Sequence, residues 1–168
     1  MTTTLFTNAH IATGEPGSTA ASTLPLQDIL VTDGVFTAFG PGLAQQYEAQ
    51  GGDPAAIEVV DLGGKLVCPP FCDTHLHLDY VFTARKPGAV NESGTLFEGI
   101  QRWSETKSDL TVDEIKQRAK IGIKKEMLHG VQLIRSHADV TDPNLTSLKA
   151  LLELKEELKD TVTLQIVS

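Results

Sequence analysis

An α/β fold is predicted for residues 71–168, and three observations support it. Apolar segments of strand length alternate there with longer segments whose apolar residues recur at helical spacing. One helix begins with a capping box, Thr111-Val112-Asp113-Glu114, in which threonine and glutamate each satisfy a main-chain amide at the helix start. The resulting order, β-α-β-α-β, requires right-handed crossovers and therefore gives parallel strands with the helices outside.

The elements of this part are expected in a definite order. Strands are expected at 71–77 or 78, 131–137 and 161–167, and helices at 95–107, 111–129 and 144–159. Two apolar stripes are expected to pack on the sheet: Ile115, Ala119, Ile123 and Met127 from the middle helix, and Leu145, Leu148 and Leu152 from the last. The segment 79–94 is broken by glycine and proline, which predicts a long loop over an active-site mouth.

Residues 1–64 are typical of short strands joined by turns. Strands are expected at 5–12, 26–32, 35–39 and 57–61, with a glycine- and serine-rich loop at 13–22 and a short helix after Leu43. The dipeptide Asp33-Gly34 is a hairpin signal between two of these strands. The change of pattern predicts two domains, residues 1–64 and residues 65–168.

The composition limits the class of protein. The chain has 168 residues and a formal net charge of −8, from 14 basic and 22 acidic residues. This excess of acidic residues argues against nucleic acid as a partner, because phosphate binding needs a basic face. No apolar stretch of about 18 residues and no basic, apolar leader occur, so we expect no membrane span, no secretion and a cytoplasmic location.

Two histidines end the apolar strand at 71–78, and they are the strongest candidates for chemistry. Side chains alternate along a strand, so His75 and His77 point to the same side, about 7 Å apart. Two neutral imidazoles at that spacing can hold one divalent metal. Asp73 shares their parity and is a candidate support for the site. A His-x-His pair alone is a weak signal, but the carboxyl end of a strand in an α/β fold is where active sites lie.

The two cysteines are too far from the histidine pair in an extended strand to complete a zinc site. Cys68 and Cys72, with the two histidines, would make a Cys2His2 set. In an extended strand Cys68 and His77 lie about 30 Å apart, whereas zinc ligands converge within about 2.3 Å of one ion. We therefore expect free thiols, buried in the strand together with Leu66, Val67 and Phe71.

Four segments carry a resemblance to a known family. Val67–Asp79, V-C-P-P-F-C-D-T-H-L-H-L-D, resembles the first barrel strand of the amidohydrolase superfamily. Ser93–Glu105, Arg135–Val140 and 145–167 resemble the bacterial cytosine deaminase branch. The resemblance implies the N-terminal part of a metal-dependent (β/α)8 barrel, preceded by part of a small β-sandwich domain. A complete barrel takes about 250 residues, so the barrel is expected to be incomplete in this chain.

The resemblance also implies a reaction. One Fe2+ or Zn2+ would be held by His75 and His77, together with a histidine and an aspartate expected beyond Ser168. That metal would activate water for attack on the ring carbon that bears an amino group, and a glutamate, also beyond Ser168, would transfer protons. The expected activity is hydrolytic deamination of a small cyclic amidine, cytosine to uracil and ammonia. Isoguanine, creatinine or another amidohydrolase substrate are alternatives, and so is a non-catalytic piece that acts only in assembly.

Other expectations concern partners and neighbouring residues. The partners expected are a nucleobase-like small molecule and further copies of the full-length chain, with no nucleic acid and no membrane. His137 and Asp139 are expected to pack beside the metal or the substrate, with a metal ligand as the alternative for His137, although the resemblance implies no ligand from that strand. Gln165 is expected to fill the barrel interior. Phe97 and Trp103 are expected to pack in the core or in a lid, with stacking on a substrate as the alternative.

The 168 residues alone are expected to be inactive and poorly folded, because the third strand has an open edge.

Overall fold

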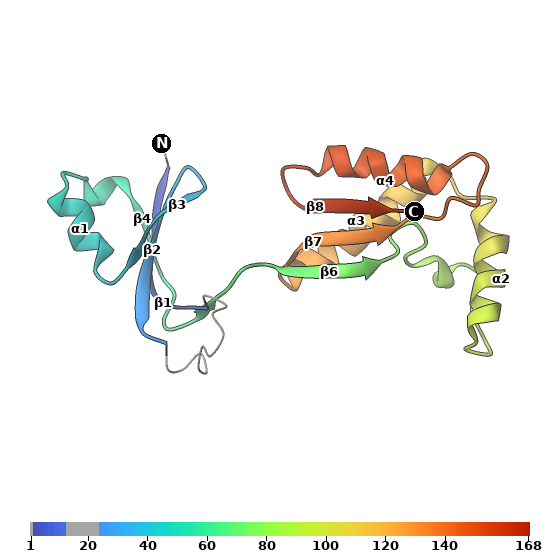
Figure 1. The fold of residues 1–168 in the computed structure, drawn as a ribbon, viewed down its shortest axis with the longest axis horizontal. Helices are drawn as coiled ribbons and strands as arrows, with labels where there is room; N and C mark the ends of the chain where they lie inside the picture. Colours follow the sequence, from blue (N-terminus) through green and yellow to red (C-terminus); the bar gives the residue numbers. More distant parts are fainter. Residues whose placement is uncertain (1, 13–23) are drawn as a thin grey trace. The chain divides into compact units, whose positions relative to one another are not determined.

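The computed structural model describes residues 2–12 and 24–168, which fall into two compact units, Met1–Pro69 and Pro70–Ser168 (Figure 1). The loop expected at 13–22 lies outside the described residues. No helix in the described ranges is both long enough and apolar enough to cross a membrane. Each unit is built around its own sheet, and the histidine pair belongs to the second.

The first unit is a five-stranded sheet with β1 at its centre. Its strands are β1 (Thr3–Ile11), β2 (Leu26–Thr32), β3 (Val35–Gly40), β4 (Glu58–Asp61) and β5 (Leu66–Val67). The order is β3-β2-β1-β4, and β5 also pairs with β1. The hairpin predicted between β2 and β3 is confirmed: Asp33 and Gly34 both have positive φ, 50° and 79°, as its two-residue turn requires. Strands β4 and β5 run parallel to β1.

Short helical segments complete this unit. They are α1 (Leu43–Ala49) and the 3-10 turn η2 (Pro54–Ala56). The buried core consists of Leu5, Ala9, Ile29 and Leu43. The described residues form a single sheet here, so the β-sandwich stays a prediction. Leu66 and Val67 pair with His10 and Ile11, and therefore belong to this sheet rather than to the strand that carries the histidines.

The second unit confirms the predicted β-α-β-α-β order. Its strands are β6 (Phe71–Leu76), β7 (Val131–His137) and β8 (Thr163–Val167), all parallel and in that order. Its helices are η3 (Thr83–Arg85), α2 (Leu96–Lys107), α3 (Val112–Leu128) and α4 (Thr146–Glu157). Three strands do not close a barrel, so the sheet remains open.

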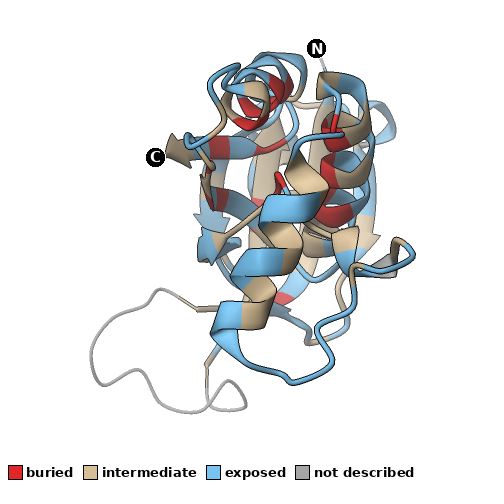
Figure 2. Ribbon diagram, turned by 90° about the vertical axis from the view of Figure 1, so that its right-hand side faces the viewer, coloured by how far each residue is buried: buried red, intermediate tan, exposed pale blue. Residues whose placement is uncertain are grey.

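Helices α3 and α4 pack on one face of this sheet and enclose its core. The buried residues, drawn in red in Figure 2, include Ala119 and Ile123 of α3, Leu151 and Leu154 of α4, and Ile134 and Leu164 of the strands. Strand residues next to the buried ones point away from the helices and are exposed: Leu133, beside the buried Ile134, is 41% exposed. Phe71, at the start of β6, is 61% exposed. The expectation that Leu66, Phe71 and Cys72 are buried is therefore wrong. Cys72 lies on the uncovered face, next to Leu133 and Gln165.

The two long helices differ in how well their packed faces were predicted. The capping box of α3 is present, and Ile115, Ala119 and Ile123 are buried as expected. For α4, however, Leu145 is 38% and Leu152 50% exposed, so the predicted inward stripe is wrong at these two positions, whereas Leu148 packs against the buried core as expected. The buried residues of α4 are Ser147, Ala150, Leu151 and Leu154. Their i, i+3, i+4, i+7 spacing is that of a helix packed along one side.

Candidate metal centre

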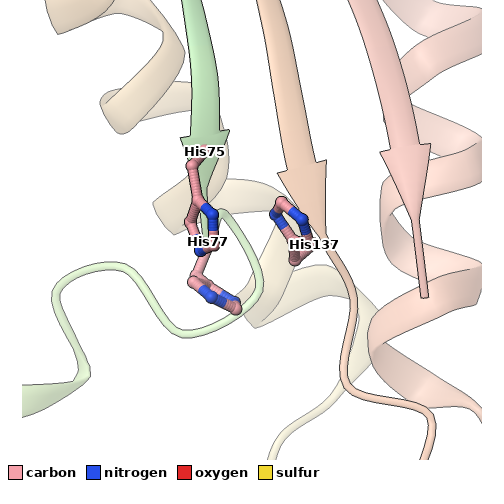
Figure 3. Close-up of side chains that lie close together, drawn as sticks. All are labelled: His75, His77 and His137. Carbon is pink, nitrogen blue, oxygen red and sulfur yellow. The ribbon is translucent and has the colours of Figure 1, made fainter.

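The candidate centre lies at the carboxyl ends of β6 and β7. His75 is within β6, and His77 is the first residue after it. The prediction that the pair shares one side of the strand agrees with the geometry, since the ring centroids are 5.3 Å apart in an edge-on arrangement at 61°. Figure 3 shows both rings turned toward the end of the neighbouring strand.

A third histidine joins the pair from β7. His137 stacks on His75 with centroids 4.1 Å apart and an interplanar angle of 25°, and it lies 5.5 Å from His77. Each of the three imidazoles offers a nitrogen within 4.8 Å of the others (Figure 3). Parallel strands bring their carboxyl ends to one edge, and this places His137 beside residues about 60 positions earlier.

The donor set fits a divalent metal. The Nδ1 atoms of His77 and His137 are buried without a hydrogen-bond partner, and a buried polar atom in that state is costly. Burial lowers the pKa of His77; Asp79 opposes this shift, while His137 and His75 add to it. The imidazole of His77 is therefore neutral at neutral pH, which is the protonation state that a metal ligand needs.

A buried carboxylate lies directly behind His77. The Asp79 side chain is fully buried, and its Oδ1 is 3.9 Å from Nδ1 of His77. Its two oxygens accept main-chain hydrogen bonds from Tyr80 N (3.0 Å) and Asp139 N (2.9 Å). Burial raises the pKa of Asp79, and these hydrogen bonds and His77 oppose that shift. Asp73, the support suggested by strand parity, instead accepts a hydrogen bond from the main-chain N of His75 at 2.9 Å.

Aromatic rings continue from the histidines toward α2. Tyr80 stacks on His77 with centroids 4.6 Å apart, and Trp103 lies 5.0 Å from Tyr80. Burial, with a smaller contribution from Asp79, raises the pKa of Tyr80, so its hydroxyl stays protonated at neutral pH. A pocket of about 290 Å³ lies between the loop after β6 and α2, lined by Tyr80, Trp103, Leu96 and Ile100 among others.

The end of β7 is tied to α2 by the carboxylate of Asp139. Its Oδ2 accepts hydrogen bonds from Nε1 of Trp103 (2.5 Å) and Nζ of Lys107 (3.1 Å). Its Oδ1 accepts from the main-chain N and the hydroxyl of Thr141. Burial raises the pKa of Asp139, but the hydrogen bonds from Thr141, Trp103 and Lys107 outweigh it and hold the pKa below its usual value.

Several residues differ from their expected roles. Phe97 is 83% exposed and packs in no core, because α2 buries none of its residues. Cys68 and Cys72 are free thiols as predicted, but both are exposed. Gln165 lies on the uncovered face of the sheet, where its Oε1 accepts a hydrogen bond from Nε of Arg135 at 2.8 Å. A closed barrel has its helices outside, so this face would be the interior, and the expected role of Gln165 stays a prediction. Asp79 and Tyr80 had no predicted role, although Asp79 repeats the spacing of the His-x-His pair two residues on.

Comparisons with known proteins agree with this geometry. The amidohydrolase family matches residues 58–155. N-isopropylammelide isopropyl amidohydrolase of Pseudomonas sp. (strain ADP) is 34% identical over 113 residues, which are 65% of this chain and 28% of that protein. Pterin deaminase of Rhizobium rhizogenes (strain K84) is 27% identical over 145 residues, 84% of this chain and 30% of that protein.

Solved structures give the same picture. The 5-methylcytosine deaminase from Klebsiella pneumoniae, liganded with 5-fluorocytosine, is 38% identical, with a TM-score of 0.78 over 98% of this chain and 36% of its own. The guanine deaminase from C. acetobutylicum is 18% identical, with a TM-score of 0.62 over 98% of this chain and 35% of its own, and it supports the fold alone. The chain spans about a third of the length of the proteins it matches.

Proposed function

The chain belongs to the amidohydrolase family, and on that premise we propose that it supplies the histidine pair and one wall of the active site of a metal-dependent deaminase. The resemblance and the α/β barrel fold expected from the sequence are confirmed by the family match and by the 5-methylcytosine deaminase structure. The observation that carries the proposal is the position of His75 and His77 at a strand end, in a chain 38% identical to that deaminase.

We assign the metal to the histidine pair. His75 and His77 would hold one divalent ion, and imidazole nitrogens suit either Fe2+ or Zn2+. When bound, such an ion supplies Lewis-acid activation of water near neutral pH. The net reaction proposed is cytosine plus water giving uracil plus ammonia.

The chain's own residues contribute orientation and shape. Burial keeps His77 neutral and therefore able to act as a ligand. Tyr80 places an aromatic ring on His77, Trp103 lies beside Tyr80, and a flat heterocycle can stack on such rings. The adjoining pocket of about 290 Å³ leaves room for a ring of nucleobase size beside this wall.

The catalytic machinery can be tested separately from the substrate. In a chimera, this chain replaces the segment it matches in the Klebsiella pneumoniae 5-methylcytosine deaminase. We expect the purified, metal-loaded chimera to release ammonia from the parent enzyme's substrate. A folded chimera that binds one metal per chain and releases no ammonia, beside an active parent enzyme, would refute the proposed role of these residues.

The substrate needs a second measurement. The protein expressed from its own gene and loaded with metal is assayed for ammonia release from cytosine, isoguanine and creatinine at equal concentrations. We expect cytosine to be turned over fastest. Turnover of isoguanine or creatinine alone would exclude cytosine while keeping the deaminase reaction, and hydrolysis of an N-alkylated aminotriazine alone would favour the chemistry named for the Pseudomonas relative.

The 168-residue chain alone is predicted to be inactive. It offers the proposed pair as ligands, whereas catalytic zinc sites have about three protein ligands and an open position. We therefore expect metal to be lost on dialysis and no ammonia to be released from cytosine. Metal analysis after dialysis and an ammonia assay check this expectation, and turnover by the isolated chain would contradict it.

His137 is predicted to orient His75 by stacking rather than to bind the metal. The rings face each other at 4.1 Å, so the contact is between ring faces. We expect His137→Phe, which keeps an aromatic ring but no nitrogen, to change the metal dissociation constant less than about threefold, and His137→Ala to weaken binding more. Calorimetric titration of both variants with metal decides this. A large loss of metal affinity in His137→Phe would show that His137 is a third ligand.

A further inference from the structure

Asp79 is a buried charge that the proposed function does not yet use. Its side chain is fully buried, and burying an ionised carboxylate is costly unless it is paired. Arg118 is hydrogen-bonded to Asp79, but not to its carboxylate. Its Nη2 donates to the main-chain oxygen of Asp79 at 3.1 Å. Within residues 2–12 and 24–168, the one ion-pair contact of the carboxylate is with His77.

Main-chain hydrogen bonds hold this carboxylate in place. Oδ1 accepts from Tyr80 N and Oδ2 from Asp139 N, so the group joins the loop after β6 to the residue two positions past His137. It therefore fixes the spacing of the two strand ends that carry the histidines. With both oxygens held, the orientation of the carboxylate toward His77 is fixed as well.

The ring nitrogen of His77 that lies within 4 Å of this carboxylate is the buried, unpartnered Nδ1. Nδ1 of His77 and Oδ1 of Asp79 are 3.9 Å apart, which is about 1 Å longer than a hydrogen bond. A small rotation of the ring can close this gap. Histidines that ligate metals almost always donate their other N–H to a carboxylate, a carbonyl oxygen or water, and this fixes the tautomer and the ring orientation.

We propose that Asp79 is a positioning residue, which accepts a hydrogen bond from Nδ1–H of His77 and thereby presents Nε2 of that ring to the metal. This inference rests on the proposed function, because it assigns His77 the role of a ligand. It extends that function by naming the tautomer of His77 and the group that selects it. Asp79 itself touches neither metal nor substrate.

The first test reads the tautomer in the metal-free protein. The 15N chemical shifts of the His77 ring, assigned by comparison with His77→Gln, distinguish Nδ1–H from Nε2–H. We expect Nδ1–H in the wild-type chain and a shift toward Nε2–H in Asp79→Asn. A purely structural role of Asp79 leaves the tautomer unchanged. The matched control is Asp73→Asn, because Asp73 lies two residues before His75 as Asp79 lies two residues after His77. Its carboxylate accepts a hydrogen bond from the main-chain N of His75.

The second test measures metal affinity. Titration of Zn2+ or Co2+ against a chromogenic chelator is expected to give a dissociation constant about 10- to 100-fold weaker in Asp79→Asn than in the wild type. Asp73→Asn is expected to change the constant less than about threefold. Equal affinity of Asp79→Asn and the wild type would overturn the inference.

The outcomes separate this inference from the proposed function. If the wild-type chain binds no metal at any concentration tested, the assignment of His75 and His77 as metal ligands is wrong. The tautomer comparison still decides the role of Asp79. If Asp79→Asn does not fold, the wild-type spectrum alone is decisive. Nδ1–H on His77 supports the inference, and Nε2–H in the wild type overturns it.

Discussion

Replacing His75 or His77 by alanine is expected to abolish tight metal binding and to slow deamination at least about a thousandfold in the metal-loaded chimera. A catalytic metal contributes several kcal/mol of transition-state stabilisation, and each 1.36 kcal/mol is a factor of ten in rate. The two rings lie 5.3 Å apart at one strand end, so loss of either leaves the ion with a single ligand of the pair. Metal analysis and an ammonia assay measure both effects.

The matched control for this prediction is His129→Gln. His129 caps the end of α3, with Nδ1 2.7 Å from the main-chain oxygen of Lys125, and it is not among the three clustered histidines. We expect its replacement to leave the metal content unchanged. Full metal occupancy in both His75→Ala and His77→Ala would rule out the pair as the metal site.

Local chemistry explains why much of the second unit was predictable. The capping box at Thr111 satisfies its main-chain amides with side chains three residues apart, so its whole signal lies within four residues. Gly130, with φ of 85°, ends the helix in a conformation that glycine adopts easily. Between this end and the next loop, β7 has the predicted bounds, Val131–His137.

The start of α4 was harder to predict because a side chain four residues away sets it. The carboxylate of Asp142 accepts hydrogen bonds from the main-chain N and the hydroxyl of Thr146, at 3.0 and 2.6 Å. Leu145 takes a left-handed conformation with φ of 52°, so the helix begins at Thr146 and not at 144. The packed stripe of α4 includes Leu151 and Leu154, with Leu148 partly buried beside them, rather than Leu145 and Leu152.

The candidate site was predictable only where it is local in sequence. The spacing of His75 and His77 predicted their common side, because strand geometry alone determines it. The role of Asp79 depends on Asp139, 60 residues later, and no pattern near Asp79 reports that partner. His137 was recognised as lying at a strand end, but its stacking on His75 follows from the pairing of β6 with β7.

Helix α2 is expected to come loose when Asp139 is replaced by alanine. None of the residues of α2 is buried, and its last turns are tied to the end of β7 by Trp103 and Lys107, both hydrogen-bonded to Asp139. Hydrogen bonds to a charged group contribute about 1.5–3 kcal/mol each. Trp103 is the only tryptophan, so its emission reports on the contact. We expect a red shift in emission and faster amide exchange across Leu96–Lys107 in Asp139→Ala.

The pH dependence of this contact follows from the carboxylate. The pKa of Asp139 is held below its usual value of 3.8 by its hydrogen bonds, which outweigh burial. Its stabilising contribution is therefore complete above the unfolded-state pKa and is lost only as the pH falls through the lower folded-state pKa. The emission of Trp103 in the wild type should accordingly be constant from neutral pH down to about pH 4.

Asp109→Ala is the matched control for Asp139→Ala. Asp109 lies just past the end of α2, and its carboxylate accepts one weak hydrogen bond, from the Ser108 hydroxyl at 3.4 Å. Its loss removes the same charge from the same region without touching Trp103 or Lys107. We expect unchanged emission and unchanged exchange in this variant. If Asp139→Ala behaves like Asp109→Ala, then the packing of Trp103 against Tyr80 and against Leu110, Ile115 and Ala150, and not the carboxylate, holds α2 in place.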